Sequence, residues 1–197
     1  LLPPEVVQAH DEGIIHFHDA DYFAQHMHNC DLVNLEDMLQ NGTVISDTMI
    51  EKPKTFSTAC NIATQIIAQA ASNQYGGQTI TLSHLAPFVN ESRKKYRHKF
   101  AGATDEFIEK MVHDDIEKGI QTIQYQILTL LTSNGQTPFI TIYMDINEVE
   151  DGQIRKDLAD IIEEVLRQRI QGVKNEVGVW ITPTFPKLIY TLDENNI

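Results

Sequence analysis

The sequence predicts an α/β fold that is rich in helix and does not close on itself. Long segments carry apolar residues at helical spacing, two β-branched segments indicate strands, and the two kinds alternate along the second half of the chain. The expected order is an irregular N-terminal region, three long helices, a strand, a helix and a strand. Because so few strands cannot close a barrel, we expect these residues to form part of a larger α/β unit.

The first two helices are predicted from the spacing of apolar residues. Residues 34–40 could form a short helix, and Thr55 to Gln74 form a long one rich in Ala, Ile and Gln. Its apolar stripe consists of Ala59, Ile62, Ala63, Ile66 and Ala70. The YGG segment at residues 75–77 should end this helix, because glycine tolerates the left-handed backbone conformation found at helix ends.

The next two helices are predicted from capping residues. Ser83 is a candidate N-cap, with Pro87 in the first turn, and this helix continues into residues 93–99. Thr104 caps the following helix, and two acidic residues lie near the positive end of its dipole. The expected buried stripe of this long helix is Ile116, Ile120, Ile123, Ile127 and Leu130.

The remaining elements are two strands and a helix. Residues 133–136 form a turn before the first strand, Thr137 to Asp145, in which β-branched residues alternate. Asp151 opens an amphipathic helix that ends near Gly172. Its apolar face consists of Ile154, Leu158, Ile161 and Val165. A second strand begins at Val177 and is interrupted by the turn TPTFP.

Composition excludes several classes of protein. The chain has 197 residues, 42% of them hydrophobic and 22% charged, which is typical of a globular protein. The net charge of −13 argues against a general nucleic-acid surface, and no apolar run is long enough for a membrane span. Two cysteines are too few for a disulfide framework, so we expect a cytoplasmic protein with reduced thiols. The chain begins without a methionine and without the pattern of a signal peptide, so we expect it to be a fragment of a longer protein.

The densest group of chemically reactive residues is HFHDADYFAQHMHNC, residues 16–30. Two H-x-H pairs place imidazoles on one face of an extended segment, and nearby carboxylates and a thiol complete a possible ligand set. One hypothesis is therefore a metal-binding or metal-dependent hydrolase module; its ligands would be His16, His18, Asp21, His26 and Cys30. The alternative is a polar segment whose histidines bind backbone groups and carboxylates.

The two cysteines and a basic segment allow further hypotheses. Cys30 is either a small core residue on a short buried strand or a nucleophile or redox group beside polar neighbours. Cys60, inside a stripe of small residues on a helix, is expected to pack in the core. The segment RKKYRHK, residues 93–99, has five Lys or Arg in seven positions and is either an anion site or a solvated helix face.

Two turns at strand ends are weaker candidates for a ligand site. SNGQTPF, residues 133–139, places amide side chains and backbone N–H groups where a buried strand begins. TPTFPKLIY, residues 182–190, places two prolines and a lysine in a strand break. The glycine-rich fingerprints of common nucleotide-binding loops are absent from the sequence.

Five blocks together resemble one family. GIIHFHDADYF, HMHNCDLVNLEDML followed by NG, ASNQYGGQT, LTSNGQTPFITIYMD and GVWITPTFPKLIY occur in the order and spacing of anaerobic (class III) ribonucleoside-triphosphate reductases. The resemblance covers essentially the whole chain. It implies the N-terminal part of the catalytic core, residues 1–197, with effector-binding and dimerisation helices at about residues 50–131, and without an ATP-cone or a glycyl-radical segment.

The resemblance also implies a fold and an activity. The fold would be part of a ten-stranded α/β barrel of the glycyl-radical enzyme type, built from two five-stranded halves. The enzyme would be a homodimer that reduces ribonucleoside triphosphates to deoxyribonucleoside triphosphates, with formate as reductant and a deoxynucleoside triphosphate as effector. Its glycyl radical, made by a radical-SAM activase with an iron–sulfur cluster, and its zinc site would lie outside these residues.

Residue roles follow from the same blocks. Cys30 matches the family's cysteine on the first barrel strand, which delivers a hydrogen atom or electron to the substrate ribose. The implied substrate-binding residues are Asn29, Asn134 and Gln136. The implied effector site uses His16 or His18, Glu51, Gln65, and Lys94 or Lys95. On this resemblance the histidines of residues 16–30 are not metal ligands, and the fragment alone is expected to be inactive.

Overall fold

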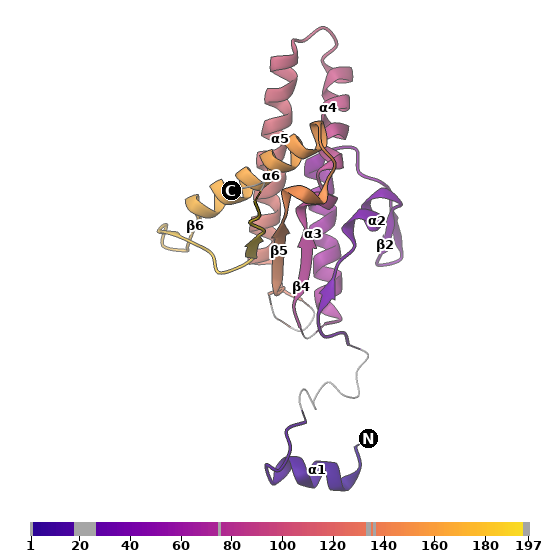
Figure 1. Cartoon of the computed structure of the whole chain (residues 1–197), viewed down its shortest axis with the longest axis vertical. Helices are drawn as coiled ribbons and strands as arrows, with labels where there is room; N and C mark the ends of the chain where they lie inside the picture. Colours follow the sequence, from indigo (N-terminus) through magenta and orange to yellow (C-terminus); the bar gives the residue numbers. More distant parts are fainter. Residues whose placement is uncertain (1, 18–26, 75, 133–134, 136, 195–197) are drawn as a thin grey trace.

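The computed structural model of the chain describes residues 2–17, 27–74, 76–132, 135 and 137–194. Its centre is a parallel sheet of four strands in the order β1-β4-β5-β8 (Figure 1). The strands are β1 (Asp31–Leu32), β4 (Gln78–Thr81), β5 (Ile140–Met144) and β8 (Lys187–Tyr190). The predicted α/β class is therefore confirmed, with a parallel sheet at its centre.

The pairing register aligns the beginnings of the four strands. Asp31 pairs with Gln78, and Gln78 pairs with Ile140. On the other side of β5, Thr141 pairs with Lys187. Because all four strands are parallel, the segments that lead into them meet at one end of the sheet.

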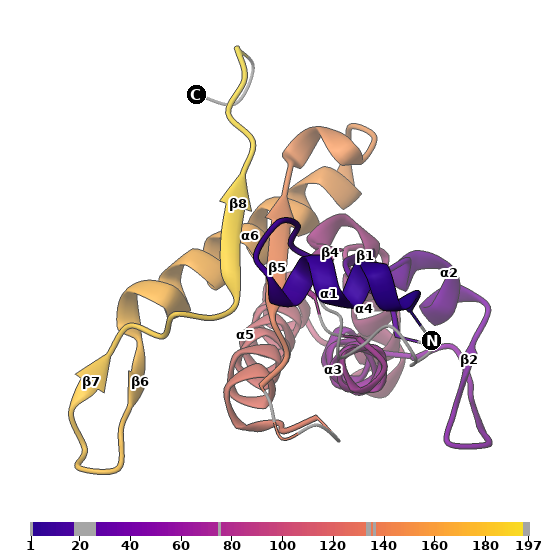
Figure 2. The ribbon, with the colours of Figure 1, turned by 90° about the horizontal axis from the view of Figure 1, so that it is seen from below.

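Helices cover one face of the sheet. The four long helices are α3 (Phe56–Ser72), α4 (Pro87–Lys99), α5 (Asp105–Thr129) and α6 (Gln153–Gln171). Apolar residues of these helices form one core with the buried positions of β4 and β5, and Figure 2 shows α3 and α5 on the same side of the strands. The alternate strand residues, such as Thr79 and Thr141, are half-buried on the opposite face.

Smaller elements surround this core. They are the helices α1 (Pro4–Asp11) and α2 (Leu35–Gln40), the antiparallel hairpins β2 (Thr43–Ile45) with β3 (Thr48–Ile50) and β6 (Val173–Lys174) with β7 (Trp180–Ile181), and the 3-10 turns η2 (Leu82–His84) and η3 (Ile146–Glu148). α1 has no buried residue and lies apart from the sheet in Figure 1. None of the helices in the described part of the chain has the length and hydropathy that a membrane crossing requires.

The N-cap predicted at Thr104 is confirmed, and the helix predicted from apolar spacing at Thr55 to Gln74 is α3. Thr55 caps α3, and its side chain accepts a hydrogen bond from the Thr58 N–H. Thr104 caps α5 in the same way, through the Phe107 N–H. The short helix predicted at residues 34–40 is α2. In each case the signal is local, because a cap needs only a side chain and backbone N–H groups two or three residues away.

Two predicted helix starts, at Ser83 and Asp151, and one predicted buried position, Leu130, were wrong. Ser83 lies in η2, and α4 starts later, at Pro87, after Ala86. Leu130 follows the last turn of α5 and is only half-buried. α6 begins at Gln153 after Gly152, so Asp151 lies outside it. One 3-10 turn or one glycine can move the end of a helix by a few residues. The apolar spacing that predicts the helix stays the same.

The predicted strands also need correction. The first begins at Ile140 rather than Thr137, and the second splits into β7, which pairs with β6, and β8, which joins the sheet. Cys30 is not on a buried strand: it is exposed and precedes β1. β4 and α1 have no counterpart among the predicted elements. β4 is a four-residue segment whose strand geometry depends on pairing with both neighbours.

Candidate active site

The candidate site lies where the four strands begin. The Asp31 N–H donates to the Gly77 carbonyl at 3.1 Å, and the Gln78 N–H donates to the Phe139 carbonyl at 2.9 Å. These bonds connect the segment that contains Cys30 to the glycine pair before β4, and the glycine pair to the TPF segment before β5. Three of the five sequence blocks thus meet at one end of the sheet.

Cys30 is an exposed thiol that lies next to the side chain of Asn29. Its Sγ lies 3.4 Å from Oδ1 of Asn29, which is also exposed. The backbone of this segment passes very close to Gly76: a Cβ atom at that position would lie 2.2 Å from the Asn29 carbonyl oxygen. Gly76 is therefore required for this close approach. The predicted role of the YGG segment in ending the helix is wrong, because α3 ends at Ser72 with Asn73 as its C-cap and neither Gly76 nor Gly77 has a positive φ.

A pocket of about 320 Å³ opens beside the glycine pair. It combines polar groups with an aromatic ring, and its lining residues are Ala71, Gln74, Gly76, Gly77, Thr132, Thr137, Pro138 and Phe139. Gln74 is only 5% exposed, and its side chain links β1 to the glycine pair. The sequence pattern predicts Gln74 only as the last residue of a helix, and nothing in that pattern indicates its contacts with distant segments.

Two aromatic rings and a lysine lie together near the beginning of β8. The rings of Phe139 and Phe185 lie 4.7 Å apart between centroids, and the Lys187 Nζ lies 4.8 Å from the Phe139 ring centroid. Arg169 on α6 holds the turn before β8 by donating to the carbonyl oxygens of Pro183 and Pro186. The TPTFP segment therefore joins the same end of the sheet as Cys30.

Two of the predicted substrate residues, Asn134 and Gln136, lie outside the described residues. The third, Asn29, is adjacent to Cys30. Thr137 and Phe139, from the block that contains Asn134 and Gln136, line the pocket beside Gly77. The geometry places this block near Cys30, although the individual roles stay predictions.

The predicted effector residues lie on separate elements. His16 follows α1, with its ring 5.6 Å from that of His10, and His18 lies outside the described residues. Glu51 is exposed directly after β3. Gln65 is exposed on α3 and lines a groove of about 290 Å³ that is formed by α3 and α5.

The two predicted lysines are exposed on α4, outside that groove. The Nζ of Lys94 lies 2.9 Å from a carboxylate oxygen of Glu91.

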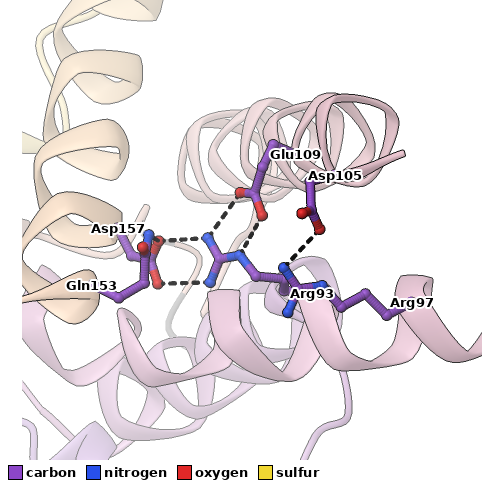
Figure 3. Close-up of polar contacts among 6 residues, drawn as sticks. All are labelled: Arg93, Arg97, Asp105, Glu109, Gln153 and Asp157. Carbon is purple, nitrogen blue, oxygen red and sulfur yellow. Dashed lines mark hydrogen bonds and ion pairs between the residues drawn. The ribbon is translucent and has the colours of Figure 1, made fainter. Parts of the chain in front are cut away.

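The basic segment at residues 93–99 is more than an exposed face or an anion site. Arg93 is only 6% exposed and binds Glu109 of α5 and Asp157 of α6, each through two hydrogen bonds (Figure 3). The Arg97 guanidinium, largely exposed, lies 3.1 Å from Asp105. Both arginines are therefore engaged in ion pairs, and the positive charge of the segment is partly neutralised.

The metal hypothesis finds no support in the described part of the chain, which contains no group of three His, Cys, Asp or Glu residues arranged to hold an ion. Three of its proposed ligands, His18, Asp21 and His26, lie outside the described residues. Cys60 is fully buried, as predicted, and burial together with the charge of Asp115 raises the pKa of its thiol well above the ordinary value. It is a packing residue.

Comparison with known proteins shows which family the chain resembles. The family model described as anaerobic ribonucleoside-triphosphate reductase matches residues 1–197. Proteins of that name from Haemophilus influenzae and Escherichia coli are each 39% identical to the chain, over 204 and 201 residues, and the match covers 98% of the chain and 27% of either relative. The protein of that name from bacteriophage T4 is 36% identical over 203 residues, with 98% and 32% covered.

A solved structure shows the same fold. The anaerobic ribonucleotide reductase from Thermotoga maritima, with dATP bound in the specificity site, superposes with a TM-score of 0.68 at 21% identity, and the match covers 95% of the chain and 32% of that structure. The chain thus spans between a quarter and a third of the length of these relatives.

Proposed function

Because the chain belongs to the anaerobic ribonucleoside-triphosphate reductase family, we propose that it forms the N-terminal part of the catalytic core of such an enzyme. The enzyme would reduce ribonucleoside triphosphates to deoxyribonucleoside triphosphates by radical chemistry under anaerobic conditions, in the cytoplasm. The four parallel strands would belong to a ten-stranded α/β barrel, with the half-buried face of the sheet toward its interior.

The observation that carries this proposal is the position of Cys30. An exposed thiol lies at the edge of the sheet, level with the pocket beside β4 and β5. From there the S–H group would deliver a hydrogen atom to a radical on the substrate ribose, whose 2'-hydroxyl takes up a proton and leaves as water. The sulfur radical that remains would be reduced back to the thiol with electrons from formate. The Oδ1 of Asn29, 3.4 Å from Sγ, would orient the thiol as an acceptor of its hydrogen bond.

The other components of the reaction lie beyond the residues of this chain. A glycyl radical, generated by a radical-SAM activase with an iron–sulfur cluster, would supply the unpaired electron, and formate would supply the reducing equivalents. Zinc would also be held elsewhere. Within this chain, Asn29, Asn134 and Gln136 would bind the ribonucleotide.

Replacement of Cys30 tests the proposal directly. In the full-length protein that contains this chain, Cys30→Ala should abolish deoxynucleotide formation, while electron paramagnetic resonance still detects the glycyl radical at its normal amplitude. The matched control is Cys60→Ala, which removes the buried packing thiol and should leave turnover in place. Normal turnover by the Cys30→Ala enzyme would show that this thiol takes no part in the reaction.

We also propose an effector site for a deoxynucleoside triphosphate on the helices at about residues 50–131, at a homodimer interface. The residues would be His16 or His18 with Glu51 and Gln65, and Lys94 or Lys95 would bind the phosphates. Gln65 lies exposed in the α3–α5 groove, and both lysines are exposed, so all three side chains are accessible to a nucleotide.

Calorimetric titration of the full-length protein with dATP, dGTP, dCTP and dTTP tests the effector site. A charge-assisted phosphate contact contributes about 1.5–3 kcal/mol, so loss of the binding lysine should weaken binding roughly 10- to 100-fold. Lys94→Ala and Lys95→Ala are the test variants, and Lys110→Ala on the exposed face of α5 is the control. Equal affinities in all three variants would exclude both lysines as phosphate ligands.

A further inference from the structure

We propose that Gln74 is a positioning residue that holds the segment bearing Cys30 in place for its reaction. The inference rests on the proposed function, since it assigns Gln74 a role only if Cys30 is the reacting thiol. Gln74 directly follows the C-cap of α3 and is 5% exposed. It touches the Cys30 segment on one side and the glycine pair on the other.

The side-chain amide of Gln74 joins two backbone segments. Its Nε2 donates to the Gly77 carbonyl at 2.9 Å and to the Asp31 carboxylate Oδ2 at 3.3 Å. An amide nitrogen has two hydrogens, so one side chain can make both bonds at once. Asp31 is the residue after Cys30, and Gly77 directly precedes β4, whose first residue Gln78 pairs with Asp31.

Backbone contacts complete this arrangement. The His28 N–H donates to the Asn73 carbonyl at 3.0 Å, and the Asp31 N–H donates to the same Gly77 carbonyl at 3.1 Å. Gly76 allows the Asn29 backbone to pass within a distance that any side chain would block. Residues on both sides of Cys30 are therefore tied to the short stretch between α3 and β4.

These hydrogen bonds matter because few other interactions hold Cys30 in position. Its side chain is exposed and β1 has only two residues, so burial contributes little to its position. Reacting atoms must approach to roughly 3–3.5 Å, and a misplacement of about 1 Å can cost on the order of 100-fold in rate. A hydrogen bond to a carboxylate is stronger than one between neutral groups, so Gln74 and Asp31 form a suitable link.

The main test is Gln74→Met in the full-length enzyme, because methionine keeps the length of the side chain and removes the donor. We expect kcat to fall roughly 10- to 100-fold, by the misplacement argument. The KM for the ribonucleotide should change much less, and the glycyl radical signal should keep its amplitude. The control is Gln171→Met, at an exposed position at the end of α6, which should behave like the unmodified enzyme.

A double variant that exchanges the amide and the carboxylate provides a rescue experiment. A general loss of stability would not produce such a rescue. Gln74→Glu places a carboxylate against Asp31 and should lower kcat further. Adding Asp31→Asn restores the hydrogen bond between the two side chains in the reverse direction. The new amide at position 31 donates, and the new carboxylate at position 74 accepts. We therefore expect the double variant to recover kcat at least several-fold over Gln74→Glu alone, although the Gly77 carbonyl still lacks its side-chain donor.

The outcomes separate this inference from the proposed function. Turnover by Cys30→Ala would overturn the function of Cys30, and with it any positioning role. An inactive Cys30→Ala enzyme together with normal kcat in Gln74→Met would overturn the role of Gln74 alone. If Gln74→Met fails to fold, the swapped pair decides, and absence of recovery in Gln74→Glu/Asp31→Asn overturns the inference.

Discussion

Gly119 lies where α5 packs against the first turn of α3. A Cβ atom at this position would lie 2.7 Å from the Phe56 ring and 2.9 Å from the Cys60 Sγ. Both of those side chains are fully buried. The absence of a side chain therefore allows the two helices to approach closely, at a cost of about 1 kcal/mol in helix propensity relative to alanine.

We expect Gly119→Ala to destabilise the protein in spite of the better helix propensity of alanine. Overpacking a close-packed core costs about 1–3 kcal/mol, which should appear as a lower free energy of unfolding in urea. Adding Cys60→Ala removes one of the two clashing groups and should recover part of the loss. Wild-type stability of the single variant would mean that Phe56 and Cys60 move aside without strain.

Tyr96 on α4 is a residue whose titration reports its surroundings. Burial, followed by the charge and hydrogen bonding of Asp115, raises the pKa of its phenol to about 12. The neutral phenol is thus favoured in the folded protein. The stability gained from this raised pKa is fully present below about pH 10, the ordinary pKa of a tyrosine phenol. It is lost as the pH rises through 12.

A difference titration of wild type against Tyr96→Phe isolates this group. The near-ultraviolet absorbance of the phenolate, taken as the difference between the two proteins, should rise with a midpoint near pH 12. In urea, the stability advantage of wild type should also shrink between pH 10 and 12. A midpoint near 10 would show that the phenol is solvated.

At the scale of elements, Arg93 connects three helices. Its guanidinium lies on α4 and forms paired hydrogen bonds with Asp157 on α6 and Glu109 on α5, as Figure 3 shows. Gln153 donates a further bond to Asp157 at 2.9 Å. The carboxylates raise the pKa of Arg93, so the buried charge is permanent.

Removing Arg93 should destabilise the packing of α4 on α5 and α6. Asp157 is 1% exposed, and loss of the partner of such a buried charge costs about 3–5 kcal/mol. Urea unfolding of Arg93→Met measures this cost. Arg97→Met is the matched control on the same helix; its pair with Asp105 is largely exposed, and exposed pairs contribute about 0–1 kcal/mol. Similar losses in both variants would contradict the distinction between buried and exposed pairs.

Elements differ in how well the sequence predicts them. α3 and α5 were predicted to within a few residues of their ends, α3 from its regular apolar stripe and α5 from the cap at Thr104 and the stripe that follows it. β4 was missed, although its buried residues Gln78 and Ile80 are at the centre of the sheet. A short central strand is stabilised by neighbours that are distant in sequence, and local patterns do not contain that information.

At the scale of the whole molecule, the parallel sheet assembles the candidate site from distant segments. Cys30 and Phe139 lie more than 100 residues apart in the sequence, yet the glycine pair between them hydrogen-bonds to both neighbouring segments. The pocket draws its lining from the end of α3, the segment after α5 and the segments that lead into β4 and β5. A site of this kind exists only after the strands have paired.

The sequence by itself determined the helix-rich α/β class, the principal helices, the burial of Cys60 and, through five ordered blocks, the family. These features depend on residue type and on spacing within a few turns, which a linear pattern records. Only the tertiary structure decided that Arg93 is buried, that Cys30 is exposed, and that Gln74 ties the Cys30 segment to the glycine pair. Those properties depend on pairing and packing between segments far apart in the chain.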